Sequence, residues 1–251
     1  MAISLEMMRS ELTSVLVDTP PGVPVASRLC SACVGLFGVD GAAVSFVDQG
    51  ASRGTFGSSS ETSRRLDEYQ FTFGEGPCLD AVASVEPVLV PDLDSPKETR
   101  WPAFAGAVLD EGVRGVFAVP ILLKSMCVGA LDLFREAPGP LEGDQLRGAL
   151  LAAELVSMPL LDLLHHDDQD DPFDGLEDRW GRSLEMDRLE VHQATGMLIA
   201  QLQVGPEEAL LRLRAHAIAT GQTASEVAWA IIERRLVLDR DDQDGTGKGS
   251  R

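Results

Sequence analysis

The stretch 192–201, HQATGMLIAQ, has the apolar spacing of a helix but carries a glycine in its middle. A glycine inside a helix costs roughly 1 kcal/mol relative to alanine, because it loses more conformational freedom when the chain folds. Gly196 therefore needs a compensating role in packing or in function. We expect another helix of the chain, or a partner chain, to approach it closely, since such an approach requires a position without a side chain.

Three helices are expected around this stretch. The first covers about 178–202, the second starts at the Gly205-Pro206 pair, and the third opens with a capping box at Thr223. Apolar residues of the first helix repeat at the seven-residue spacing of a coiled coil, which predicts a dimer seam. The residues of this seam are Leu184, Val191, Ala194 and Leu198.

Upstream of these helices, short runs of β-type character are interleaved with helical runs. GAAVSFVD at 41–48 and GVFAVPILL at 115–123 are two such strands, and YQFTF at 69–73 is read as another, joined to a helix by GEGPC. The order predicts an α+β domain with a mostly antiparallel sheet and flanking helices, followed by an all-α three-helix unit. The predicted divisions are an N-terminal helix with a linker (1–24), the α+β domain (25–164), an acidic linker (165–177), the helical unit (178–238) and a disordered tail (239–251).

The charge of the chain limits its partners. A net charge of −19 and an isoelectric point near 4.5 argue against nonspecific binding to polyanions, because affinity for phosphate needs Lys and Arg. No apolar run approaches the roughly 20 residues of a membrane span, and the N-terminus lacks a signal-peptide pattern. We therefore expect a cytoplasmic protein without membrane contact.

Cysteine and histidine usage gives no metal site and no cofactor. Cys30 and Cys33 are spaced as C-x-x-C, but they lie in an apolar helical pattern, and residues 1–164 contain no histidine that could complete a zinc site. Core packing is the interpretation of this pair. The four cysteines are expected to be reduced thiols.

A candidate ligand site surrounds the glycine-rich segment 74–78, GEGPC. A glycine-rich turn before a helix can bind an anion, and it can equally be turn geometry. Aromatic residues downstream could wall a pocket or fill the core. The candidate ligand-binding residues are Gly74, Glu75, Gly76, Cys78, Trp101 and Phe104.

The helical unit resembles the ANTAR domain. The resemblance is carried by Ala194 with Gly196-Met197-Leu198, followed by Glu207-Glu208-Ala209, Leu213-Arg214, Ala217 and Val227-Ala228. It implies a homodimer that binds paired hairpin loops in nascent RNA and prevents a terminator from forming. Thr195 stands where many members carry Lys. The candidate RNA-binding residues are Gln193, Thr195, Gly196, Gln201, Arg212, Arg214 and His216.

The α+β domain resembles the GAF domain, a sensor fold. Its matching residues are Gly74 to Cys78, Pro87-Val88, Asp92-Leu93, Trp101 to Phe104 and Gly129 to Asp132. The order of the two domains is similar to that of actinobacterial GAF-ANTAR regulators. It implies a non-enzymatic regulator of transcription antitermination, controlled by a small-molecule ligand or an upstream signalling protein.

Two other functions stay open. One is a protein-interaction or ligand-sensing regulator with little RNA binding. The other is a GAF-type free methionine sulfoxide reductase, which would use a cysteine placed like Cys78. Those enzymes carry a partner cysteine in the segment that here reads SPKETRWPAF, 95–104, and this segment has none.

Overall fold

The computed structural model describes residues 4–19, 23–48, 51–141, 143–165 and 188–238. The chain separates into two compact units, Met1–Arg188 and Leu189–Arg251. Each unit is described by itself below. The predicted acidic linker, the first part of the expected helix at 178–202, and the predicted tail lie outside the described residues, apart from His165 at the end of a helix.

The first unit is built on a five-stranded sheet in the order β2-β1-β5-β4-β3, and every neighbouring pair is antiparallel. Alternate residues of each strand face opposite sides of such a sheet. On β1, Val44 joins the larger core, whereas Ala43 joins a smaller core on the other face. The strands are β1 (Gly41–Asp48), β2 (Ala51–Ser58), β3 (Val88–Val90), β4 (Gly115–Leu123) and β5 (Met126–Arg135).

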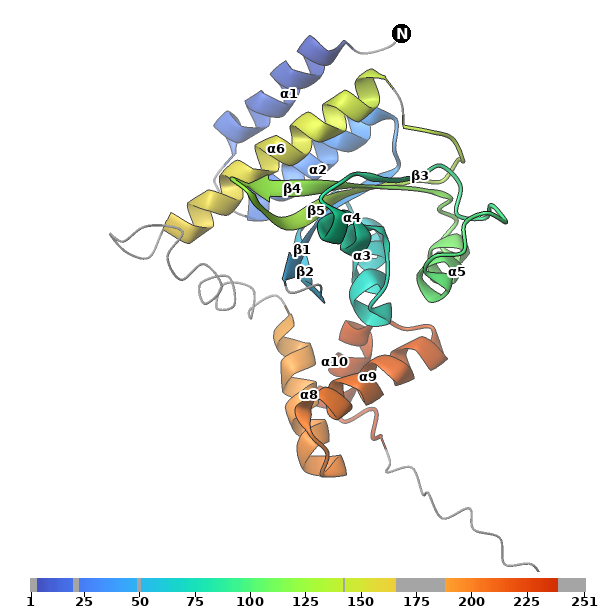
Figure 1. The fold of residues 1–251 in the computed structure, drawn as a ribbon. Coiled ribbons are helices and arrows are strands. Elements are labelled where there is room, and N and C mark those ends of the chain that lie inside the picture. The colour runs from blue at the N-terminus through green and yellow to red at the C-terminus, as the bar shows by residue number, and fades with distance from the viewer. Residues whose placement is uncertain (1–3, 20–22, 49–50, 142, 166–187, 239–251) are drawn as a thin grey trace, which may run out of the picture. The chain divides into compact units, whose positions relative to one another are not determined.

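Helices cover both faces of this sheet (Figure 1). Three of them, α1 (Leu5–Asp18), α2 (Val23–Phe37) and α6 (Asp144–His165), pack together over the larger core. The opposite face carries α3 (Glu61–Phe73), α4 (Pro77–Ser84) and α5 (Pro102–Asp110). The α+β class with a mostly antiparallel sheet and flanking helices is confirmed. Cys30 and Cys33 are buried in the larger core, as expected from their apolar pattern.

The segment 51–73 differs from the prediction. YQFTF is not a strand but the last part of α3, which Ser60 caps at its start and Gly74 ends in a left-handed conformation with φ 67°. Leu66, Tyr69 and Phe73 belong to or pack against the smaller core at helical spacing. The alternation of aromatic and polar residues in YQFTF imitates a strand, but residues 69–72 are all buried and belong to the helix that continues from Glu61.

The second unit contains α8 (Leu189–Leu202), α9 (Pro206–Thr220) and α10 (Ala224–Ile232), which pack against one another. The predicted helix starts hold, because Pro206 lies in the first turn of α9 and both hydrogen bonds of the Thr223 capping box are present. An all-α three-helix unit is therefore confirmed.

The predicted dimer seam requires a correction. Val191, Ala194 and Leu198 are buried within the single chain, where their side of α8 packs against α9 and α10. Their spacing of three to four residues marks the core face of an amphipathic helix as well as a coiled-coil surface. These three residues are thus not available as a surface between two copies. The fourth, Leu184, lies outside the described residues.

Candidate functional site

Gly196 lies on the exposed face of α8, and the expected close approach by another helix of the same chain is wrong. A Cβ atom built on Gly196 would meet no described atom within 4 Å. His192, Gln193 and Ala200, one turn to either side, are also exposed. The face of α8 opposite its core is therefore an exposed surface that carries small and polar side chains at these positions.

Two other candidate residues on α8 donate hydrogen bonds to backbone carbonyls of the same unit. The hydroxyl of Thr195 donates a hydrogen bond to the backbone carbonyl of Val191 over 2.7 Å, and the side chain is half-buried. The amide of Gln201 donates to the carbonyl of Leu238, also over 2.7 Å. Only Gln193 and Gly196 of the four α8 candidates belong to the open face.

The candidates on α9 lie on more than one side of that helix. Arg212 donates to one carboxylate oxygen of Glu208 from Nε (3.1 Å) and from Nη2 (2.9 Å). An ion pair of this i,i+4 type on a helix surface contributes about 0.3–0.5 kcal/mol, so an incoming phosphate could replace Glu208 at small cost. His216 lies one turn after Arg212 and is half-buried, as is Arg214.

The GEGPC segment has a structural role in the first unit. Gly76 has φ 150°, and a Cβ there would meet Oε1 of Gln70 at 2.5 Å. The same Gln70 oxygen accepts a hydrogen bond from the backbone N–H of Cys78 over 2.8 Å. Gly76 therefore lets the Gln70 side chain pass to the start of α4. The segment joins two helices, α3 and α4, rather than a strand and a helix.

Glu75 caps a helix that is distant in sequence. One of its carboxylate oxygens accepts hydrogen bonds from the N–H groups of Ala103 (2.7 Å) and Phe104 (3.1 Å), in the first turn of α5. The residue before this helix, Trp101, gives it no side-chain cap. Trp101 instead donates from Nε1 to Asp80 over 3.1 Å.

The structure thus brings Glu75, Trp101 and Phe104 together through the first turn of α5. Glu75 occupies the N-terminus of α5, whereas the predicted anion site lies at the start of α4, and Phe104 is fully buried in the smaller core. The assignment of a ligand site to GEGPC stays a prediction.

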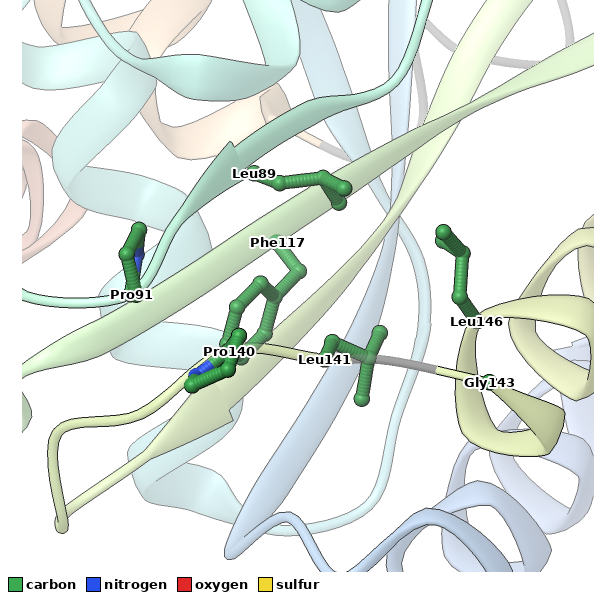
Figure 2. Close-up of a pocket in the computed structure, with 7 residues that line it drawn as sticks. All are labelled: Leu89, Pro91, Phe117, Pro140, Leu141, Gly143 and Leu146. Atoms are coloured by element: carbon green, nitrogen blue, oxygen red, sulfur yellow. The ribbon is translucent and has the colours of Figure 1, made fainter.

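A described cavity of about 580 Å³ lies elsewhere, on the sheet face that carries α6 (Figure 2). Its lining is apolar, and none of the six predicted ligand-binding residues contributes to it. Small-molecule sites usually add a few polar groups that fix the orientation of the ligand. The lining residues are Leu89, Pro91, Phe117, Pro140, Leu141, Gly143 and Leu146.

Sequence reasoning missed a cluster of buried polar side chains between the sheet and the helices α3 and α4. Ser45 on β1 contacts both Asp67 on α3 and Asp132 on β5, with 2.7 Å to Oδ2 of Asp132. Gln70 donates to the same Oδ2 over 3.0 Å, and Thr55 on β2 donates to Asp67. The available signal was a polar residue on the inward face of each of three strands.

Burial raises the pKa values of the ionisable side chains in this cluster. Desolvation raises the pKa of Asp132 well above its usual range, and the charge of Asp67 raises it further. Burial also raises the pKa of Asp67, although hydrogen bonds from Ser45 and Thr55 oppose the shift. The pKa of the Cys78 thiol, which lies beside the two carboxyl groups, is raised well above its usual range by burial.

None of the described helices is both long and apolar enough to cross a membrane. None of the curated proteins matches the chain in sequence. Solved structures that resemble it include the GAF domains of phosphoenolpyruvate-protein phosphotransferases from Coxiella burnetii and Acinetobacter. The first has 14% identity and a TM-score of 0.51, and covers 64% of this chain and 95% of the other. The second has 10% identity and a TM-score of 0.50, and covers 64% and 96%.

A free methionine-R-sulfoxide reductase from Neisseria meningitidis is also similar, with 18% identity, a TM-score of 0.47 and coverage of 63% and 95%. At such identities these likenesses concern the fold alone. Two family models identify the parts of the chain more closely. The GAF domain model matches residues 25–158, more than half of the chain, and the ANTAR domain model matches residues 186–232. The chain therefore belongs to the GAF domain family and carries an ANTAR domain after its GAF domain.

Proposed function

We propose that this chain is a transcription antitermination regulator whose ANTAR domain binds RNA with paired hairpin loops, under the control of its GAF domain. It acts in the cytoplasm, on nascent transcripts, as a homodimer. The observation that supports the proposal most directly is the exposed glycine on α8. Gly196 lies in the matched ANTAR region, and no described residue of the chain approaches it.

The reason lies in the free energy of the helix. A glycine in the middle of α8 costs roughly 1 kcal/mol relative to alanine, and no packing by the described residues compensates for it. A binding partner that comes into van der Waals contact with the backbone would use this position. Exposed bases of an RNA loop suit such a surface, because proteins read unstacked bases by stacking and by hydrogen bonds to their edges. The adjacent Gln193 offers an amide donor and acceptor for those edges.

Because the ANTAR domain carries a net negative charge, its contacts with RNA phosphates would come from a few individual arginines. Acidic residues outnumber arginines in this domain, so general attraction to phosphate is weak. Arg212 and Arg214 on α9 would contact phosphates locally, with Arg212 exchanging Glu208 for a phosphate. Two units in one dimer would hold two loops of the same RNA, and the second loop would then bind at a high effective concentration. The GAF domain would respond to a small-molecule ligand or an upstream signalling protein and change how the units pair.

RNA binding by the full chain tests the proposal. Fluorescence anisotropy at low salt would compare a transcript with two hairpins, the same transcript with one loop deleted, and an unstructured RNA. We expect binding to require both loops, and the bound complex to contain two protein chains. Gly196→Glu should weaken binding at least tenfold, because it places a negative charge on the open face, where a Cβ meets no described atom within 4 Å.

Val237→Glu is the matched control, since it adds the same charge at another exposed position of the unit. We expect its affinity to stay within twofold of that of the wild type. A transcription assay on a template with a terminator would then show read-through with the wild type and not with Gly196→Glu. Absence of binding to two-hairpin RNA at low salt would refute the proposal and favour a regulator that acts through protein contacts.

A further inference from the structure

The buried polar cluster of the GAF domain contains more negative groups than its hydrogen bonds can balance. Asp67, Asp132 and Cys78 are each fully buried, and they come from α3, β5 and α4. Removing carboxylates from water is unfavourable unless a positive charge or a proton compensates them. The cations that act on Asp67 are Arg188 and Arg64, whereas the charge that acts on Asp132 is the negative charge of Asp67.

The cluster has fewer donor hydrogens than its carboxylate contacts require. Ser45 Oγ carries one hydrogen, yet it lies within hydrogen-bond distance of a carboxylate oxygen of Asp67 and of one of Asp132. Once that hydrogen is donated to one carboxylate, the other contact joins two acceptors. The described hydrogen bonds of Gln70 add no hydrogen between Ser45 and Asp67, because its nitrogen donates to Oδ2 of Asp132 and its oxygen accepts from the backbone N–H of Cys78. The cluster therefore needs an additional proton or a cation.

The geometry suits a cation. One donor atom from each of Asp67, Cys78 and Asp132 lies within 4.8 Å of the other two. Ligand atoms around zinc at its usual bond lengths of about 2.0–2.3 Å lie about 3.5 Å apart, so small movements would complete such a set. In addition, Oδ1 of Asp132 accepts no hydrogen bond from any described residue, although the side chain is fully buried. This oxygen has a lone pair available for a metal ion.

We propose that Asp67, Cys78 and Asp132 form a buried site for a divalent cation of the zinc class. A thiolate with two carboxylates favours zinc over magnesium or calcium, which prefer oxygen ligands alone. Thr55 and Gln70 would orient the two ligating carboxylates by the hydrogen bonds they already donate, and Ser45 Oγ is near enough to be a fourth donor.

Binding of the ion has a defined proton balance. The Cys78 thiol forms a bond to the metal and releases its proton to solvent, as does whichever carboxyl group is protonated. The thiolate and the two carboxylates then carry three negative charges against the two positive charges of the ion, and the charge of Arg188, which acts on both Asp67 and Cys78, opposes the remaining one. Because its ligands come from three elements, the bound ion would tie α3 and α4 to β5. Loss or gain of the ion would thus change the rigidity of the sensor domain, independently of whether the ANTAR domain binds RNA.

Cobalt substitution tests the site in the full chain. After treatment with a chelator under reducing conditions, the chain is titrated with Co²⁺, and a thiolate-to-cobalt charge-transfer band reports a cysteine ligand. Binding of Zn²⁺ is measured by calorimetry. We expect one ion per chain, with affinity at least tenfold lower in Asp132→Asn and the charge-transfer band lost in Cys78→Ala.

Two cysteine variants serve as matched controls. Cys33→Ala removes a buried thiol on the other face of the sheet, and Cys127→Ser removes a half-buried thiol outside the cluster. Both should bind the ion as the wild type does. If Asp132→Asn does not fold, as judged by circular dichroism, Asp67→Asn takes its place. The proposal is overturned if the wild type binds no ion, or if Cys33→Ala rather than Cys78→Ala abolishes the band. It is also overturned if infrared spectra show a protonated carboxyl group that added Zn²⁺ does not remove.

Discussion

Replacement of Gly196 by alanine should stabilise the ANTAR domain and weaken its binding to RNA. The new methyl group would point into space that no described atom occupies within 4 Å, so it brings no clash and buries little surface. Its effect on stability is therefore the difference in helix propensity alone, about 0.8–1.0 kcal/mol in favour of alanine. A change of 1 kcal/mol alters an unfolding equilibrium about fivefold.

Hydrogen exchange measured by mass spectrometry gives this quantity for one helix in the full chain. Peptides that cover the buried positions Ala194 and Leu198 should exchange about fivefold more slowly in Gly196→Ala, provided that exchange follows the opening equilibrium. Ala200→Gly is the mirror control, because Ala200 is exposed one turn later on the same helix. It should accelerate exchange about fivefold, and the double variant should return to the wild-type rate.

The effect on RNA has the opposite sign. If an RNA loop contacts the backbone at Gly196, the methyl group overpacks that contact, at a cost of about 1–3 kcal/mol, or five- to 150-fold in affinity. Faster exchange in Gly196→Ala would mean that the space beside Gly196 is occupied, contrary to the structure. Slower exchange with unchanged RNA affinity would refute the assignment of this face to RNA.

Three substituted positions and one labelling experiment test other parts of the chain. Thr223→Ala removes the capping box of α10 and should lower the stability of the ANTAR domain by about 1 kcal/mol, measured by hydrogen exchange in α10. Glu75→Ala leaves the first turn of α5 without its cap and should cost the GAF domain about 1 kcal/mol in urea unfolding, whereas Glu75→Gln keeps an acceptor and should cost less. Thr195→Lys should leave the fold intact and, if its neighbours bind RNA, tighten binding and steepen its salt dependence; unchanged affinity would place the RNA face elsewhere. Burial raises the pKa of Cys33 to about 12, so roughly one molecule in ten thousand is the thiolate at pH 8, and iodoacetamide should modify the half-buried Cys127 first in the native chain.

The helical unit could be predicted from the sequence because its signals are local. Gly205 before Pro206, Gly221 and the Thr223 capping box each act within one turn of the helix end they mark. Whether the apolar residues Val191, Ala194 and Leu198 of α8 face a partner copy or the interior of the unit could not be predicted in the same way. A heptad spacing describes a surface for a partner copy and an internal face equally well, and only the packing of α9 and α10 decides between them.

The polar cluster of the GAF domain shows a different limit. Ser45 and Asp132 are 87 residues apart, and each alone resembles an ordinary polar residue in a strand. Antiparallel pairing of β1 with β5 places Ala43, not Ser45, opposite Asp132, so even the correct strand register leaves the contact to be found in three dimensions. Reading YQFTF as a strand removed Gln70 from its true helix, α3, which also carries Asp67, so the contribution of α3 to the cluster was not predicted.

Both features that carry the proposals are places where the chain departs from what stability alone would select. An exposed helix favours alanine over glycine, and a buried core favours apolar groups over two carboxyl groups and a thiol. Elsewhere the local rules hold, as in the caps of α9 and α10 and in the apolar residues of the larger core. Departures of this kind concentrate at functional sites, because function is what retains a residue that packing does not. Gly196 faces away from the described residues, so the partner we propose for it is a separate molecule, whereas Asp132 is fully buried, and the partner we propose for it is a single ion.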